Sequence, residues 1–89
     1  MNTMLIAFNL SSSGNRYNAF KDTIAGLGQV REVMPSVWIL RTLATPKRVL
    51  EYLHYHTESR DKIIAIQVGN DFAGNLSYYK IREISQLIS

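Results

Sequence analysis

The sequence lacks cysteine altogether, and it contains only two prolines and five glycines in 89 residues. Disulfide bonds, thiolate metal sites and cysteine nucleophiles are therefore excluded, and the fold must depend on packing. A chain without cysteine is compatible with a reducing compartment, and we expect a cytoplasmic protein. Long apolar runs are also missing. Residues 4–8 are too few for a signal-peptide core or a membrane span, so we expect no membrane partner.

Carboxylates are scarce and widely spaced. The aspartates Asp22, Asp61 and Asp71 stand far apart in the sequence, and no motif places two carboxylates together for acid-base catalysis. Ten Lys and Arg residues against seven Asp and Glu residues give a formal net charge of +3. This mild excess permits contact with DNA or RNA but does not require it. The composition therefore favours a non-catalytic protein over an enzyme.

Hydrophobic spacing predicts four strands and three helices. The compact apolar run at residues 4–8 is typical of a central strand. Beyond it, apolar side chains recur at the spacing of one helical face, namely Tyr17, Phe20, Ile24 and Leu27. The predicted strands cover residues 4–10, 29–34, 36–42 and 62–68, and the predicted helices cover residues 16–27, 46–56 and 77–88.

Particular residue types predict where these elements begin and end. Asn15 is suited to cap the N-terminus of the first helix, and Gly28 to end it at the C′ position. Pro35 cannot donate to a strand ladder, so it marks the turn of a hairpin. Thr45 followed by Pro46 predicts a helix start, because threonine accepts a free N–H and proline loses nothing at the first helical position.

The order of the elements is β-α-β-β-α-β-α. Right-handed crossovers around a central hairpin give a ferredoxin-like split β-α-β fold of the α+β class, with an antiparallel sheet and an added C-terminal helix. We expect one domain over residues 1–89, with its core in 4–74 and the added helix at 77–88. Two helices cover one face of such a sheet. We place Trp38 and Leu40 on the other face, which a second copy or the C-terminal helix would cover.

Three short motifs carry a resemblance to a known family, and they are Ile6-Ala7-Phe8-Asn9-Leu10, Gly14-Asn15-Arg16-Tyr17, and Gly28 with Val30 and Ser36-Val37-Trp38. On these residues the chain resembles the small CRISPR-associated ferredoxin-like nucleases. It looks most similar to their SinR-type relatives, which share a superfamily with VapD-type toxins. The resemblance covers residues 4–74.

This resemblance implies a homodimer packed through its sheets, in which an aspartate ending the first strand sometimes holds a divalent metal. Asn9 occupies the matching position, and Ile39 stands where the CRISPR-associated members usually carry an acid. Asn9 is thus the candidate catalytic residue and metal ligand, with Mg²⁺ as the cofactor. An amide supplies no negative charge to attract a hard cation, so the resemblance supports the fold and the dimer rather than the activity.

A loop of small residues follows the first strand. Ser11, Ser12 and Ser13, with Gly14, precede a helix N-terminus, where free backbone N–H groups gather. Arg16 lies just inside the helix and would be a cationic partner for a phosphate. The loop lacks the glycines and lysine of a P-loop, so it carries no nucleotide fingerprint. We take the three serines and Arg16 as candidate nucleic-acid contacts, with an ordinary flexible connection as the alternative.

Four more basic residues are candidates for nucleic-acid contact. Arg31 and Arg41 lie on the two strands of the predicted hairpin and would face each other across it. Lys47 and Arg48 begin the second helix, close to the exit of the second hairpin strand. Together they would form a shallow basic surface that contacts phosphates. Scattered charge that only aids solubility is the competing interpretation.

The sequence supports three functional hypotheses. The first is a homodimeric, non-catalytic module that binds nucleic acid or assembles with other copies. The second is a metal-dependent endoribonuclease, toxin-like or CRISPR-associated, in which Asn9, Ser11 and Ser13 hold a hydrated Mg²⁺. The third is a reader of single-stranded RNA, in which Phe8 and Trp38 stack on bases as in an RNA-recognition motif.

Overall fold

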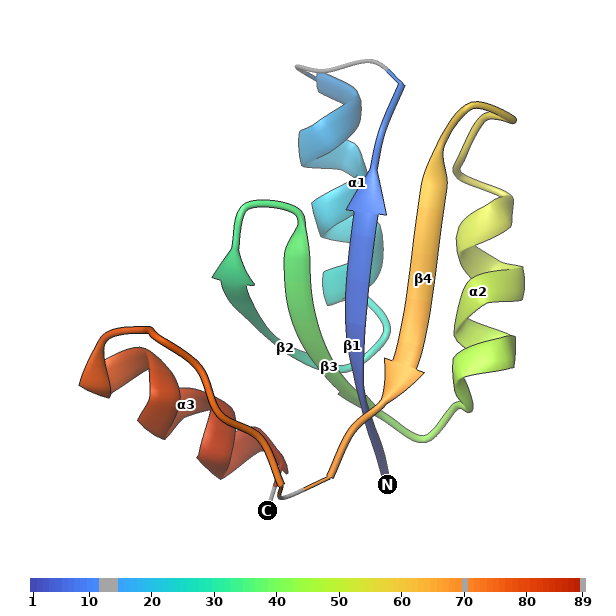
Figure 1. Cartoon of the computed structure of the whole chain (residues 1–89). Coiled ribbons are helices and arrows are strands. Elements are labelled where there is room, and N and C mark those ends of the chain that lie inside the picture. Colours follow the sequence, from blue (N-terminus) through green and yellow to red (C-terminus); the bar gives the residue numbers. More distant parts are fainter. Residues whose placement is uncertain (12–14, 70, 89) are drawn as a thin grey trace.

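The computed structural model describes residues 1–11, 15–69 and 71–88. The described residues form an α+β fold whose four strands make one antiparallel sheet in the order β2-β3-β1-β4. The elements are β1 (Asn2–Asn9), α1 (Asn15–Ala25), β2 (Gln29–Met34), β3 (Val37–Thr42), α2 (Pro46–His54), β4 (Lys62–Gln67) and α3 (Tyr78–Ile88) (Figure 1). The predicted ferredoxin-like arrangement with a C-terminal helix is confirmed. No helix in the described part of the chain is long and apolar enough to cross a membrane.

β1 is the central strand, and its side chains divide the sheet into two faces. It pairs with β3 on one side and with β4 on the other. Successive side chains of a strand point in opposite directions. Met4, Ile6 and Phe8 therefore point to one face, which we call the helix face, while Leu5 and Ala7 point to the opposite face.

The main core lies on the helix face, beneath α1 and α2. Buried strand residues meet the buried stripes of these two helices in a single cluster. The cluster consists of Met4, Ile6, Phe8, Trp38, Leu40, Phe20, Ile24, Val49 and Leu53. The prediction that Trp38 and Leu40 lie on the uncovered face is wrong. They pair with Ile6 and Met4 of β1, so their side chains share the helix face.

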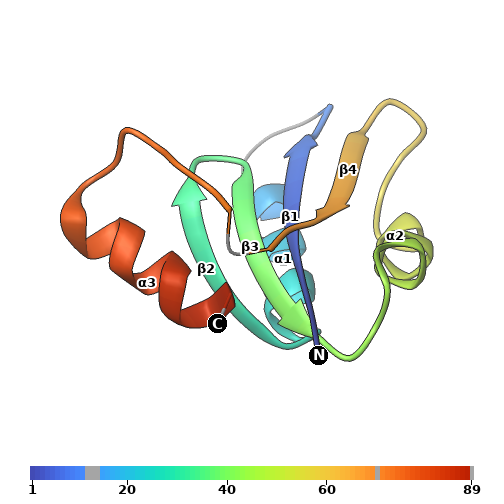
Figure 2. The ribbon, with the colours of Figure 1, turned by 60° about the horizontal axis from the view of Figure 1, so that its bottom comes forward.

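α3 covers part of the opposite face, so the prediction that the C-terminal helix folds over the sheet is correct for that part. Figure 2 shows α1 and α3 on opposite sides of the sheet. Ile84 and Leu87 of α3 are buried against Ile39 of β3. The helix packs over β2 and β3, and on β4 the side chains of Ile64 and Ile66 remain 53% and 49% exposed.

The start of α2 follows the predicted capping chemistry. The backbone N–H of Arg48 donates to the Thr45 hydroxyl at 3.3 Å, and Pro46 takes the first helical position. The helix ends at His54, two residues before the predicted end, because Tyr55 already serves as its C-cap. Thr45 thus fixes the direction in which the chain enters the helical layer.

The end of α1 differs from the prediction. The helix stops at Ala25, and the N–H groups of Gly26 and Leu27 bond to the carbonyls of its last turn at 3.1 and 3.0 Å. Gly28 is therefore not the helix-ending C′ residue. A Cβ at Gly28 would lie 2.2 Å from the carbonyl oxygen of Arg41, so the glycine allows the chain to pass close to β3.

Candidate functional site

The end of β1 carries the residue that the family resemblance singled out. Asn9 is exposed, and its partner in the ladder across β4 is Lys62. Ser11 is the last described residue before the small-residue loop. Ser12 and Ser13, which we took as candidate nucleic-acid contacts, lie outside the described residues.

Arg16 and Asp61 are the best-defined polar contact near this strand end. The Arg16 guanidinium donates to both oxygens of the Asp61 carboxylate, through Nη2 to Oδ2 in a short contact and through Nη1 to Oδ1 at 3.5 Å. Glu58 adds a second carboxylate, with Oε2 3.9 Å from Arg16 Nη1. The Asp61 side chain has no solvent-exposed surface, whereas 29% of the Arg16 side chain is exposed.

Two backbone groups complete the surroundings of Asp61. The N–H of Ser11 donates to Oδ1 and the N–H of Glu58 donates to Oδ2, both at 2.7 Å. Hydrogen bonds from Arg16, Glu58 and Ser11 favour the ionised carboxylate and hold the pKa of Asp61 well below its usual range. The hydrogen bond to Asp61 in turn raises the pKa of the Arg16 guanidinium. Asp61 therefore occupies the position beside Ser11 and Arg16 where the sequence led us to expect a phosphate group.

The end of β1 does not fit a magnesium ion. Mg²⁺ is held in proteins through carboxylates, with several waters retained. Asn9 carries no charge and stands opposite the cationic Lys62. The nearby Asp61 carboxylate already accepts four hydrogen bonds. Within residues 1–11, 15–69 and 71–88, no group of three His, Cys, Asp or Glu residues could hold a metal ion.

The four other basic candidates do not gather with Arg16. Lys47 and Arg48 are exposed in the first turn of α2, which follows β3. Because β1 and β3 are antiparallel, β3 ends at the opposite end of the sheet from β1 and from the start of α1 (Figure 1). Arg31 and Arg41 lie on β2 and β3 of the hairpin. The basic candidates therefore lie on several elements, and Lys47 and Arg48 are at the opposite end of the sheet from Arg16.

Within the hairpin, the expectation that the two arginines face each other is wrong. Arg41 stands opposite Gln29, and Arg31 stands opposite Ile39. The two side chains are diagonal neighbours on the same face, displaced by two residues. The two strands were predicted correctly from the sequence. Their register, however, does not place Arg31 directly opposite Arg41.

Neither aromatic residue of the RNA-reader hypothesis is available to a base. Phe8 is 6% exposed, and its ring centroid lies 4.7 Å from that of Phe20 in α1. Trp38 is 9% exposed, and the ammonium of Lys21 lies 5.6 Å from its ring centroid. Both rings point to the helix face, so the hypothesis loses the stacking residues on which it depended.

Sequence reasoning missed an apolar pocket on the face that carries α3. The pocket has a volume of about 440 Å³ and lies between α3, residues 68 and 72–76, and the sheet. Its lining residues are Leu5, Val33, Met34, Val37, Ile39, Val68, Phe72, Ala73, Gly74, Asn75, Leu76, Ile81, Ile84 and Ile88. The apolar residues Phe72 and Leu76, which lie between the last strand and the last helix, were the signal in the sequence that could have indicated it.

Comparison with known proteins gives no relative from which a role could be transferred. No family model, no curated protein and no solved structure matches the chain. A functional assignment therefore depends on the surfaces described above.

Proposed function

We propose that the chain is a non-catalytic assembly module of the cytoplasm, which forms a homodimer through the part of its sheet that α3 leaves open. The observation that supports this proposal is the exposure of Ile64 and Ile66, at 53% and 49%, on an ordered strand. Apolar side chains grouped on an exposed sheet surface mark interaction sites.

The exposed isoleucines belong to a continuous apolar surface. Ile64 pairs with Ala7, and Ile66 pairs with Leu5, so all four side chains point to the same face on adjacent strands. We call Ala7, Ile64 and Ile66 the open patch. Burying apolar surface stabilises association by roughly 25 cal/mol per Å² before the entropic cost of association is subtracted. A second copy offers a matching apolar patch by symmetry.

The polar features support assembly over chemistry. The carboxylate of Asp61 and the guanidinium of Arg16 neutralise each other, and their contact joins the start of α1 to the chain just before β4. The cationic residues that could follow a phosphate backbone are dispersed over separate elements. A binding function of the open patch requires neither a metal ion nor a reacting side chain.

The oligomeric state of the purified chain tests the proposal. We expect sedimentation equilibrium to show a dimer, and the Ile64→Lys variant to weaken dimerisation by at least about tenfold, since the charge would have to be desolvated. Leu43→Lys is the matched control, because Leu43 is 80% exposed in the connection between β3 and α2. A monomeric wild type at all accessible concentrations, or equal weakening by both substitutions, would contradict the proposal.

The competing functions are tested on one gel. Labelled single-stranded RNA and duplex DNA are incubated with the protein, with and without Mn²⁺, and both mobility and cleavage are recorded. We expect neither cleavage nor a salt-sensitive shift. Metal-dependent cleavage that is lost in Asn9→Ala would establish the endoribonuclease instead, and binding without cleavage would establish a nucleic-acid module.

A further inference from the structure

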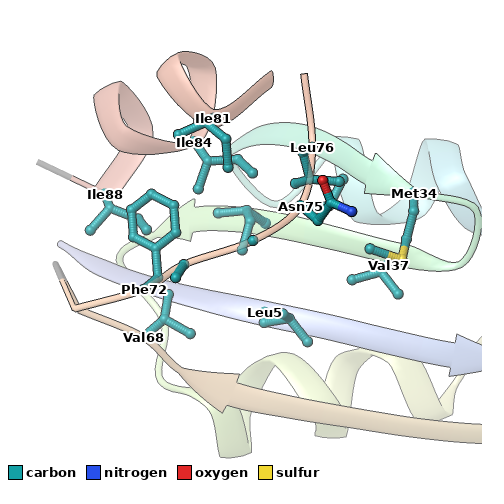
Figure 3. A pocket seen from close by; sticks show the side chains of 14 residues that line it. Leu5, Met34, Val37, Val68, Phe72, Asn75, Leu76, Ile81, Ile84 and Ile88 are labelled. Atoms are coloured by element: carbon teal, nitrogen blue, oxygen red, sulfur yellow. The ribbon is translucent and has the colours of Figure 1, made fainter. Parts of the chain in front are cut away.

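The apolar pocket beneath α3 is a partly open recess whose walls come from several elements of the chain. Figure 3 shows the lining side chains arranged around a central space, with strand residues such as Leu5 and Val37 on one side and Ile81, Ile84 and Ile88 of α3 on another. The segment that links β4 to α3 contributes Phe72 and the residues up to Leu76. The pocket is therefore built from β1, the β2-β3 hairpin, the segment before α3 and α3 itself.

The chemistry of the lining is nearly uniform. No Asp, Glu, Lys, Arg or His residue is among the 14 described residues that line the pocket, and Asn75 is the one of these 14 with a polar side chain. In Figure 3 the Asn75 amide lies near Met34, at the side of the pocket away from Ile88. Pockets that bind small molecules are typically about 300 to 1,000 Å³, mostly apolar, with a few polar groups that set orientation. At about 440 Å³, this pocket belongs at the lower end of that range.

We propose that this pocket binds a small, uncharged, mainly apolar molecule with one hydrogen-bonding group, which the Asn75 amide receives. The proposal goes beyond the assembly function and does not depend on it. A charged ligand is disfavoured, because no lining side chain could pair with it and burying an unpaired charge is costly. Ligands with a single hydroxyl or carbonyl on an aliphatic or aromatic skeleton match both the volume and the polarity.

The walls on several sides of the pocket favour a small molecule over a second copy of the chain. The residues from Phe72 to Leu76 and the helix α3 line the pocket together with the strand floor. The open patch of Ala7, Ile64 and Ile66 lines no part of this pocket. A partner chain can therefore pack on the open patch while the pocket keeps its own contents.

Two glycines of the chain provide a matched pair of variants. A Cβ on Gly74 would lie 3.6 and 3.7 Å from the Leu76 and Ile81 side chains, which is ordinary van der Waals contact inside the lining. A Cβ on Gly69 would meet nothing within 4 Å. Gly74→Leu thus extends an apolar side chain among the pocket residues, whereas Gly69→Leu adds the same atoms to open space.

The first experiment titrates the purified chain with N-phenyl-1-naphthylamine, an uncharged probe whose fluorescence increases in apolar surroundings. We expect saturable binding to the wild type and to Gly69→Leu, and a loss of affinity of roughly tenfold or more in Gly74→Leu. Thermal unfolding checks that both variants fold, and we expect Gly74→Leu to unfold at a higher temperature than Gly69→Leu. Absence of saturable binding to the wild type, or equal affinity in the two folded variants, would overturn the proposal.

The second experiment tests the role of Asn75. Naphthalene and 2-naphthol differ by one hydroxyl group, and one neutral hydrogen bond corresponds to roughly a fivefold difference in affinity. We expect Asn75→Leu to remove the preference for 2-naphthol and to leave naphthalene binding unchanged. A preference that survives in Asn75→Leu would show that the amide does not receive the ligand.

A final comparison separates this pocket from the dimer surface. We expect the affinity of the probe to be the same in the wild type and in Ile64→Lys, whether or not the chain dimerises. A probe affinity that falls as protein concentration rises, and recovers in Ile64→Lys, would show that a second copy fills the pocket. That result would overturn the small-molecule site while supporting the assembly function.

Discussion

Arg16 and Asp61 form an ion pair that joins the beginning of α1 to the chain just before β4. The same carboxylate accepts the backbone N–H of Ser11 at 2.7 Å, so three separate segments meet at one side chain. Such an arrangement fixes where β1 ends and where β4 begins. It also explains why the basic residue beside the small-residue loop is not a free phosphate ligand.

Asp61→Asn is expected to lower the stability of the fold at neutral pH. The hydrogen bonds to the ionised carboxylate depress its pKa in the folded state, so the stabilisation is complete above the unfolded-state pKa of about 4. It is lost as the pH falls below that value toward the folded-state pKa. Urea unfolding measures the difference in the free energy of unfolding between wild type and Asp61→Asn. We expect this difference to be smaller at pH 3 than at pH 7. A difference of equal size at both pH values would contradict this account.

Gly28→Ala is expected to reduce the free energy of unfolding by about 1–3 kcal/mol, as overpacking does elsewhere. The new Cβ would lie 2.2 Å from a backbone oxygen of Arg41, so one of the two chain segments must move. Gly26→Ala is the control, because its Cβ would meet the Thr23 carbonyl at an ordinary 3.5 Å. Chemical denaturation of both variants measures the difference, and a fully stable Gly28→Ala would rule out the close approach.

Trp38 should report on the core rather than on a ligand. It is the only tryptophan, it is 9% exposed, and its indole Nε1 has no hydrogen-bond partner among the described residues. We expect short-wavelength emission from the native protein that single-stranded RNA does not change. Trp38→Ala should cost about 3–5 kcal/mol of stability, and Trp38→Phe about 1–2 kcal/mol, since Phe loses no hydrogen bond. Quenching of the native emission by RNA would contradict the buried position.

The stability of the protein should depend on which side chain stands at Ser36, in the turn between β2 and β3. Its φ of 67° lies in the left-handed region, where β-branched residues are strained. Ser36→Val should therefore lower the unfolding free energy by about 1–2 kcal/mol. Ser36→Gly should change it by less than about 0.5 kcal/mol, because relief of strain and greater freedom of the unfolded chain oppose each other. A Ser36→Val protein as stable as the wild type would show that the turn adopts another conformation.

Local signals in the sequence were sufficient for most of the fold. The strand over residues 29–34 was predicted with its observed bounds, and Thr45 with Pro46 gave the start of α2. Both depend on interactions between neighbours in the chain. The face on which Trp38 lies could not be predicted in this way. An apolar run without alternating polar residues does not show which side chains point to which face of the sheet.

The candidate site was less accessible to sequence reasoning, for a related reason. Asp61 stands among charged and polar residues that look like an exposed loop, yet its carboxylate contacts Ser11 and Arg16, which are distant in the sequence. The pocket beneath α3 likewise depends on Val68 and residues 72–76 lying close to the sheet and to α3. No spacing rule connects residues that only the tertiary structure brings together.

The central position of β1 has a consequence for the order in which the chain becomes structured. The hairpin of β2 and β3 closes through a short turn, whereas Met4 finds its β4 partner only at Gln67. Joining segments so distant costs chain entropy before any contact is gained, which slows the step. We expect β4 to pair with β1 late in folding. During synthesis, one edge of the apolar strand β1 would therefore stay unpaired until residues 62–67 have left the ribosome.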